Sequence, residues 1–281
     1  MKTYLSIFAL IVMLATSCNT NFNFSDQVNG TGEVLDERMD LGTFHEIKLE
    51  KGWKVNLIPS TKNYMEVEAN TNLLDILVVE EGDGKLLIGA ESNIGNADAK
   101  NINLYFTERL DNISVSSGTD LTAESVLDFE NLELKVSSGA DAEFNAKLKN
   151  LKASVSSGAD LTMNVWGEEV ILDSSSGSDA NLEVNVMNTE ISASSGSDVE
   201  IKGETDNLNI DSSSGSDVDA RALKAKTVQV SASSGSDIDV YPLENLKAKH
   251  SSGGSIEYFH KPSNSLEIED SKSGGGVKFK S

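Results

Sequence analysis

The sequence predicts an all-β protein: a parallel β-helix, or solenoid, with coils of about 19 residues, opened by an N-terminal β-strand region. Three observations favour this fold class. A Ser-Ser-Gly motif returns at a nearly constant interval through the second half of the chain, and apolar residues alternate with polar ones on both sides of it. No helical period runs through any repeat, and proline occurs only at positions 59, 242 and 262.

The organising repeat is the stretch Val136-Ser137-Ser138-Gly139-Ala140-Asp141, which returns with small changes along the chain. Its glycines stand at positions 118, 139, 158, 177, 196, 215, 235, 253 and 274, at intervals of 18 to 21 residues. A period held over this many copies indicates stacked coils, in which each coil contacts only its neighbours.

Apolar residues on either side of the glycine predict two strand segments in each coil, each with one buried face. Three residues after the glycine the column is Leu121, Ala142, Leu161, Ala180, Val199, Val218, Ile238, Ile256 and Val277. On a straight chain the serine before the glycine would face inward and the aspartate after it outward. The glycine alternatively marks a bend, because it takes positive φ freely, and a bulge there would turn the aspartate inward.

The N-terminus predicts export and lipid attachment. The apolar run from Tyr4 to Ala15 has the length of a signal-peptide core and is too short to cross a bilayer. Residues 1–17 are predicted as a lipoprotein signal peptide, because the site before Cys18 resembles a bacterial lipobox, which implies cleavage and lipidation there. The alternative is an ordinary secretory signal with a spare thiol. Residues 18–35 are polar and are predicted as a tether.

The formal net charge of −22 limits the partners of the chain. Phosphate backbones and anionic membrane surfaces repel an acidic protein, which argues against nucleic acid and leaves a lipid on Cys18 as the membrane attachment. Since Cys18 is the only cysteine, the stability of the mature chain must come from packing rather than from an internal disulfide.

Residues 36–112 are predicted as antiparallel or mixed β structure that covers the first coil, and residues 113–281 as the β-helix, in one continuous domain from residue 36. The strings Gly52-Trp53-Lys54-Val55-Asn56-Leu57, Val67-Glu68-Ala69-Asn70, Asn72-Leu73-Leu74-Asp75, Asp83-Gly84-Lys85-Leu86 and Ile113-Ser114-Val115-Ser116-Ser117-Gly118 follow one another in this order. The series resembles the putative auto-transporter adhesin, head GIN domain family of bacterial envelope proteins. The resemblance implies a parallel β-helix and an adhesive role, and it offers no catalytic residues.

The sequence offers few candidate catalytic residues. The histidines His45, His250 and His260 are scattered and have no nucleophile at a suggestive spacing. We therefore predict a non-catalytic, lipid-anchored β-helix protein of the cell envelope, structural or adhesive in role, without a cofactor. It is placed at the outer membrane, with the periplasmic or outer face left open. A polysaccharide-processing enzyme is the remote alternative.

Calcium is the nearer alternative, with a calcium-stabilised or glycan-binding surface module as the function. Gly-x-Asp followed by an aliphatic residue resembles the glycine-rich calcium-binding nonapeptide repeats, although only one such turn occurs in each coil here. The candidate metal ligands are Asp141, Asp160, Asp179, Asp198, Asp217 and Asp237. We favour the interpretation that serine hydroxyls or amides satisfy these aspartates.

One candidate ligand patch lies near the C-terminal end of the chain and consists of Tyr241, Phe259 and His260. The alternation puts Tyr241 and Phe259 on the outer wall of successive coils, where exposed rings stack on sugars or anchor a protein. A glycan or protein receptor is therefore the predicted partner. The alternative is that the rings pack under the corner loop that holds Pro262.

Overall fold

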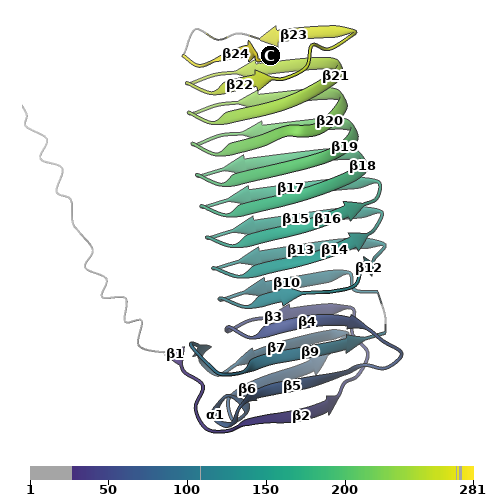
Figure 1. Cartoon of the computed structure of the whole chain (residues 1–281), viewed down its shortest axis with the longest axis vertical. Coiled ribbons are helices and arrows are strands. Elements are labelled where there is room, and N and C mark those ends of the chain that lie inside the picture. The colour runs from purple at the N-terminus through teal and green to yellow at the C-terminus, as the bar shows by residue number, and fades with distance from the viewer. Residues whose placement is uncertain (1–26, 108, 270, 272–273) are drawn as a thin grey trace, which may run out of the picture.

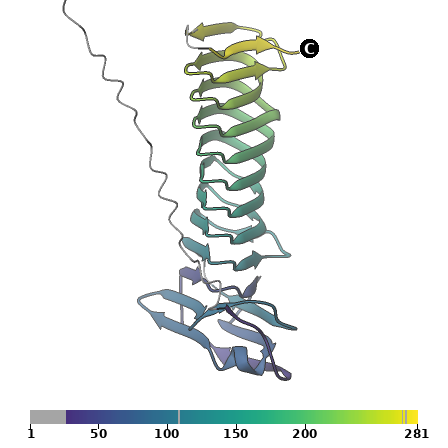
Figure 2. The ribbon, with the colours of Figure 1, turned by 90° about the vertical axis from the view of Figure 1, so that its left-hand side faces the viewer.

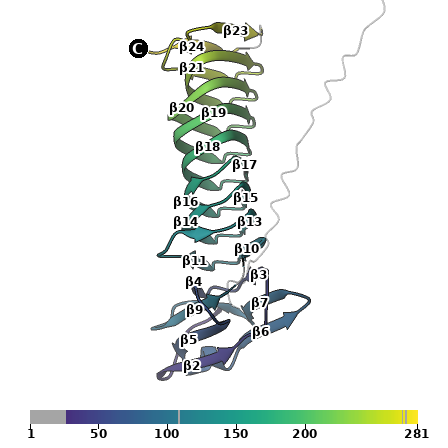
Figure 3. The same ribbon diagram turned by 90° about the vertical axis from the view of Figure 1, so that its right-hand side faces the viewer.

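The computed structural model describes residues 27–107, 109–269, 271 and 274–281. Its strands form two long walls that face each other, and the chain winds from one wall to the other as a flattened solenoid (Figures 1 and 3). Neighbouring strands within each wall of the solenoid pair in parallel. The predicted parallel β-helix is therefore confirmed.

The strands divide between the two walls as follows. Wall A contains β6 (Leu77–Gly82), β7 (Lys85–Ala90), β3 (Glu46–Leu49), β10 (Asn112–Ser116), β13 (Asn131–Ser137), β15 (Asn150–Ser156), β17 (Glu169–Ser175) and β23 (Ser265–Glu269). Wall B contains β2 (Val34–Asp40), β5 (Tyr64–Asn70), β9 (Lys100–Phe106), β4 (Lys54–Pro59), β11 (Asp120–Thr122), β12 (Leu127–Asp128), β14 (Asp141–Lys147), β16 (Asp160–Trp166), β22 (Ser255–Tyr258) and β24 (Gly276–Phe279). The long strands β18 (Asp179–Ser194), β19 (Asp198–Ser212), β20 (Asp217–Ala232) and β21 (Asp237–His250) bend at a corner and supply both walls.

A tight turn built on the Ser-Ser-Gly motif carries the chain from wall A to wall B. Ser138 and Gly139 both have positive φ, at 59° and 66°, and the same pair of conformations recurs along the solenoid. Two successive residues with positive φ reverse the chain within a few residues, as in a type I′ turn. The motif is therefore a bend. The inward position that a straight chain would give the serine is wrong, since Ser138 is exposed.

The turns stack on one another through their backbones. The Gly139 N–H donates to the Ser157 carbonyl of the next coil at 3.2 Å, and the Gly158 N–H donates to the Ser176 carbonyl at 3.2 Å. The residue after the glycine points inward and is buried, as alanine in the earlier coils and as serine in the later ones. The inward Ser197 is satisfied, because its hydroxyl donates to the Ser174 carbonyl at 3.0 Å and accepts from the Ser194 N–H.

The interior between the walls is filled by the predicted apolar columns. Leu182 and Ile201 stack on wall B, and Leu172, Ile191 and Ile210 stack on wall A. Each of these side chains is at most 2% exposed. Because every coil adds one more layer to the same columns, the core is continuous along the solenoid.

The N-terminal region closes the lower end of the solenoid (Figures 1 and 2). β3 lies between β7 and β10, and β4 lies between β9 and β11, so strands that come early in the chain stack directly under the repeats. The outermost pairs are antiparallel: β2 pairs with β5, β5 with β9, and β6 with β7. A hairpin turn joins β6 to β7, with Asp83 and Gly84 at positive φ.

Three side chains from the strings that carry the family resemblance hold this cap together. Trp53 is fully buried, and its indole N–H donates to the Gly89 carbonyl at 2.9 Å. Asn70 is buried just before the short helix α1 (Thr71–Leu74), and its side-chain oxygen accepts from the Asp98 N–H at 3.0 Å. Leu73 of α1 is fully buried as well.

The predicted tether, residues 18–35, is described from residue 27, where it forms strands instead of a linker. β1 (Gln27–Val28) pairs in parallel with β8 (Asn93–Ile94), and β2 begins at Val34. Backbone pairing with the cap orders this polar stretch, which the apolar pattern could not indicate. The predicted signal peptide and Cys18 lie outside the described residues. Across the part of the chain that the structure describes, we find no helix of the length and apolarity needed to cross a bilayer.

Candidate binding site on the C-terminal coils

The candidate metal ligands form one row along the outer face of wall B. Asp141, Asp160, Asp179, Asp198, Asp217 and Asp237 pair in register from strand to strand, and all are exposed. The turn before them is a bend, yet it leaves the aspartates facing solvent. The inward hydroxyl of Ser197 serves the backbone of the turn rather than these carboxylates.

Burial and the stacking of like charges one strand apart both raise the pKa of carboxyl groups in this row. Burial raises the pKa of the Asp217 carboxyl above its usual range, and the carboxylates of Asp237 and Asp198 raise it further. The pKa of Asp141 is raised in the same way, by burial and by Asp120 and Asp160. Because like charges on neighbouring strands repel, the row costs stability whenever its members are ionised.

Replacing Asp217 by asparagine should therefore stabilise the protein at neutral pH, by a few tenths of a kcal/mol at this exposed position. A raised folded pKa means that the native state binds this proton more tightly than the unfolded chain. The aspartate's penalty is thus present above its folded pKa and disappears as the pH falls through it. Urea denaturation of both proteins at neutral and acidic pH measures the effect. A variant that loses stability at neutral pH would contradict it.

Chelation of calcium is expected to leave the melting temperature nearly unchanged. Within the described ranges, no group of three or more histidine, cysteine, aspartate or glutamate side chains is arranged to hold a metal ion. The row nevertheless stays a candidate, since a divalent cation would relieve its repulsion. Thermal melts with and without a chelator test whether the row binds calcium. A fall in melting temperature of roughly ten degrees or more would favour the calcium-stabilised alternative.

The regular stacking of wall B is interrupted in β20. Ala220 pairs with Val240, but the next pair joins Lys224 to Tyr241, so the residues from Arg221 to Leu223 form a bulge. The spacing of the repeat glycines, 20 residues and then 18, places one extra residue here. Bulges bend a strand and re-aim its side chains. This one presents Arg221 beside the last two coils.

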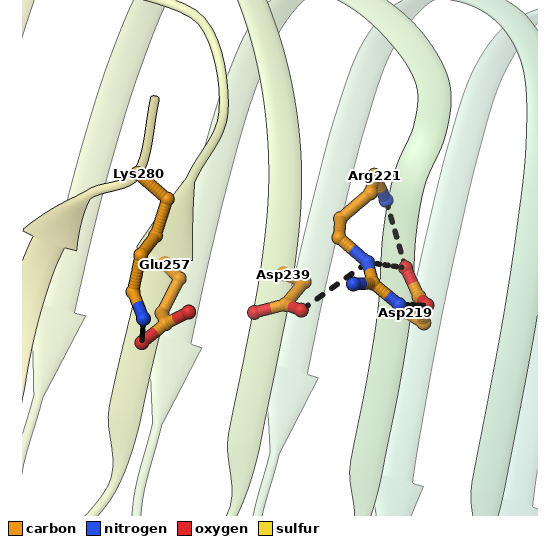
Figure 4. A network of polar contacts seen from close by, with 5 residues as sticks. All are labelled: Asp219, Arg221, Asp239, Glu257 and Lys280. Atoms are coloured by element: carbon orange, nitrogen blue, oxygen red, sulfur yellow. Dashed lines mark hydrogen bonds and ion pairs between the residues drawn. The ribbon is translucent and has the colours of Figure 1, made fainter.

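Arg221 is the centre of a charged network on these coils (Figure 4). Its guanidinium binds both carboxylate oxygens of Asp219, with Nε at 2.9 Å from Oδ1, and Nε lies 3.4 Å from Asp239. One strand further, Lys280 pairs with Glu257 at 3.0 Å. The arginine lowers the pKa of Asp219, whereas burial raises that of Asp239 despite the same arginine.

A hollow of about 370 Å³ opens on the outer face of wall B next to this network. Its polar lining is Asp217, Asp219, Asp237, Asp239, Ser255 and Glu257. Two rows of carboxylates from β20, β21 and β22 thus present many hydrogen-bond acceptors in one shallow space. Such a lining suits a ligand rich in hydroxyl or amino groups.

The predicted aromatic patch borders the same coils. The rings of Tyr241 and His260 lie 5.1 Å apart, and His260 Nδ1 is 2.9 Å from the Pro242 carbonyl. The Arg221 guanidinium lies over the ring of Phe259, 5.6 Å from its centre. All three rings are half-buried. The structure therefore brings the patch together with the charged network, which the sequence had not suggested.

The sequence does contain a signal for the acidic residues of the hollow that were not predicted as site residues. The outward position two residues after the aspartate row is neutral at Thr162 and Asn181. It is acidic in each of the next four coils, as Glu200, Asp219, Asp239 and Glu257. Of the histidines, His250 is buried at 2% exposure, in register with the buried Ala232 of the coil below, and its Nε2 accepts from the Ser271 N–H at 3.3 Å.

Together, these features define a two-walled parallel β-solenoid with a carboxylate-lined hollow and an aromatic patch on its C-terminal coils. The chain belongs to the putative auto-transporter adhesin, head GIN domain family, whose profile matches residues 43–167 and 162–262. Searched against curated proteins, the sequence gives no significant match.

Solved structures share the fold at low sequence identity. A putative lipid binding protein from Parabacteroides distasonis is 18% identical, with a TM-score of 0.67 over 90% of this chain and 100% of the other. A putative adhesin from Parabacteroides merdae is 17% identical, with a TM-score of 0.67 over 92% and 100%. A second P. distasonis protein, a putative adhesin, is 20% identical, with a TM-score of 0.57 over 90% and 99%.

Proposed function

We propose that this chain is a non-catalytic, lipid-anchored protein of the cell envelope, held at the outer membrane through Cys18, with a structural or adhesive role. Membership of an adhesin family supports the envelope location and the binding role. The apolar N-terminal run followed by Cys18 supports export and lipid attachment. Metabolic labelling with a radioactive fatty acid tests the anchor, since a Cys18→Ser variant should lose the label.

The adhesive role rests on the C-terminal coils. The bulge in β20 places Arg221 over Phe259 and beside the carboxylate-lined hollow, with Tyr241 and His260 stacked on the same coils. Carboxylates accept hydrogen bonds from sugar hydroxyls, and aromatic rings stack on the apolar face of a sugar. We therefore propose a glycan as the ligand of this surface, with a protein receptor as the other outcome of the test.

The test is binding of the full chain to an array of envelope and host glycans, before and after the double replacement Tyr241→Ser with Phe259→Ser. We expect binding to fall at least roughly tenfold, because aromatic anchors carry a large share of the energy in such sites. Trp166→Ser is the matched control, since Trp166 is an aromatic residue of wall B that is 41% exposed and lies several coils away.

The double variant must melt like the parent before its binding is interpreted, because both rings make contacts of their own. If it melts normally and binds every ligand of the parent unchanged, the surface is not the adhesive site. If the double variant still binds glycans like the parent but no longer binds proteins, the ligand of this surface is a protein receptor. Shortened glycan products after incubation would instead favour the polysaccharide-processing alternative.

A further inference from the structure

The upper end of the solenoid exposes residues that belong to the interior columns. Leu266 and Ile268 of β23 are 48% and 42% exposed, and Phe279 of β24 is 38% exposed. Each lies in register with a buried residue of the coil below, as Leu266 does with Leu246. They are exposed because, among the described strands, β23 pairs only with β21 and β24 only with β22. β23 and β24 lie at this end of the ribbon (Figure 1), and two strand edges and an apolar core layer are thus open together.

The outward side chains at this end change sign between the last two strands of each wall. On wall A, Lys247 of β21 pairs with Glu267 and Glu269 of β23 at 3.4 and 3.2 Å. On wall B the order is reversed, since Glu257 of β22 lies below Lys278 of β24 and pairs with Lys280 at 3.0 Å. One open edge is therefore acidic and the other basic. A strand complementary in charge to each edge would be basic over β23 and acidic over β24.

We propose that the C-terminal end binds a second copy of this chain end to end, with β23 of each copy antiparallel to β24 of the other. β23 and β24 run in opposite directions on opposite walls, because the chain reverses between them. A two-fold axis parallel to the strands therefore sets β23 over β24 on both walls at once. Glu267 and Glu269 then face Lys278 and Lys280 of the second copy, and the apolar side chains of the two ends meet.

Other ways of covering this end fit less well. A two-fold axis across the walls would pair β23 with β23 and β24 with β24, so glutamates would face glutamates and lysines would face lysines. Head-to-tail stacking would bring the acidic β23 against β6 on the same wall A, which carries Glu80 and Glu81, so carboxylates would face carboxylates there. Lysines alone would only protect an edge from pairing, but the glutamates of β23 supply their complement.

Sedimentation velocity of the full chain over a wide concentration range tests the proposal. We expect a reversible monomer–dimer equilibrium, weak because each paired strand is short. Lys278→Glu with Lys280→Glu should weaken dimerisation at least roughly tenfold by placing glutamates opposite glutamates. Lys202→Glu with Lys226→Glu is the matched control, because both lysines are ion-paired in the middle of the solenoid, and it should dimerise like the parent.

Mixing distinguishes this pairing from non-specific association. Glu267→Lys with Glu269→Lys should not dimerise alone but should form mixed dimers with the Lys278→Glu, Lys280→Glu protein, since opposite charges then meet on both walls. In a Cys18→Ser background, Glu267→Cys should form disulfides with Lys278→Cys rather than with itself. A chain that stays monomeric at all concentrations, a dimer unaffected by the charge reversals, or self-linked Glu267→Cys would each overturn the proposal.

Discussion

Replacing Gly203 by alanine should cost about 3 kcal/mol or more of unfolding free energy, far more than the same change at a turn glycine. Gly203 lies in β19 opposite Val184, with φ at 113°, in a region that residues with a side chain rarely adopt. A Cβ there would stand 2.0 Å from the Val184 carbonyl oxygen, so two stacked backbones would have to separate. Urea denaturation measures the loss as a lower midpoint.

Gly177→Ala is the matched control for this prediction. Gly177 also has positive φ, at 65°, but a Cβ there would meet no heavy atom within 4 Å. Its replacement should lower the unfolding free energy only by the penalty for a side chain in the left-handed region, about 1–2 kcal/mol. Equal losses at the two positions would show that the close backbone approach at Gly203 does not limit the packing of the coils.

This contrast shows which features of the solenoid are local and therefore predictable. The period of the Ser-Ser-Gly motif and the two-residue alternation around it predicted the coils, the buried columns and the outward row that ends in Asp237. Both signals depend on a few neighbouring residues. That Ser138 as well as Gly139 takes positive φ was not predictable in this way, because serine has no intrinsic preference for that conformation.

Long-range pairing could not be obtained from local patterns. The alternation in residues 36–112 predicted strands, but their stacking order depends on contacts far apart in the chain. β3 and β4 lie above β7 and β9, although they precede them in sequence. The stretch that forms β1 is polar, so no apolar pattern marks it as a strand. Its order comes from backbone pairing with β8.

The candidate site was predictable only in its aromatic part. Tyr241 and Phe259 follow from the outward column, with His260 beside them in sequence, and the structure places the rings of Tyr241 and His260 in contact. The charged network depends on the bulge in β20, whose trace in the sequence is one coil of 20 residues followed by one of 18. A spacing change of one residue shows where a bulge falls, but not that Arg221 turns toward Asp219 and Asp239.

Replacing Ile201 by alanine should cost about 2–5 kcal/mol, as expected when a large core side chain is truncated and a cavity is left behind. Ile201 is fully buried in the middle of the solenoid and stacks on Leu182 of the coil below. Glu200 and Lys202 on either side of it pair with both neighbouring strands, across a register shift toward β20, so the strand is held from the coils above and below and closes only part of the space.

A graded series of variants identifies the cause of that loss. Ile201→Val removes one methylene and should cost about 0.5–1.5 kcal/mol. Met187→Ala, at a residue that is 57% exposed, should change stability by less than about 0.5 kcal/mol. Each coil is supported only by its neighbours, so a weakened middle coil should also uncouple the two halves of the solenoid and lower the denaturant m-value. A loss at Ile201 no larger than at Met187 would contradict the continuous core on which the fold depends.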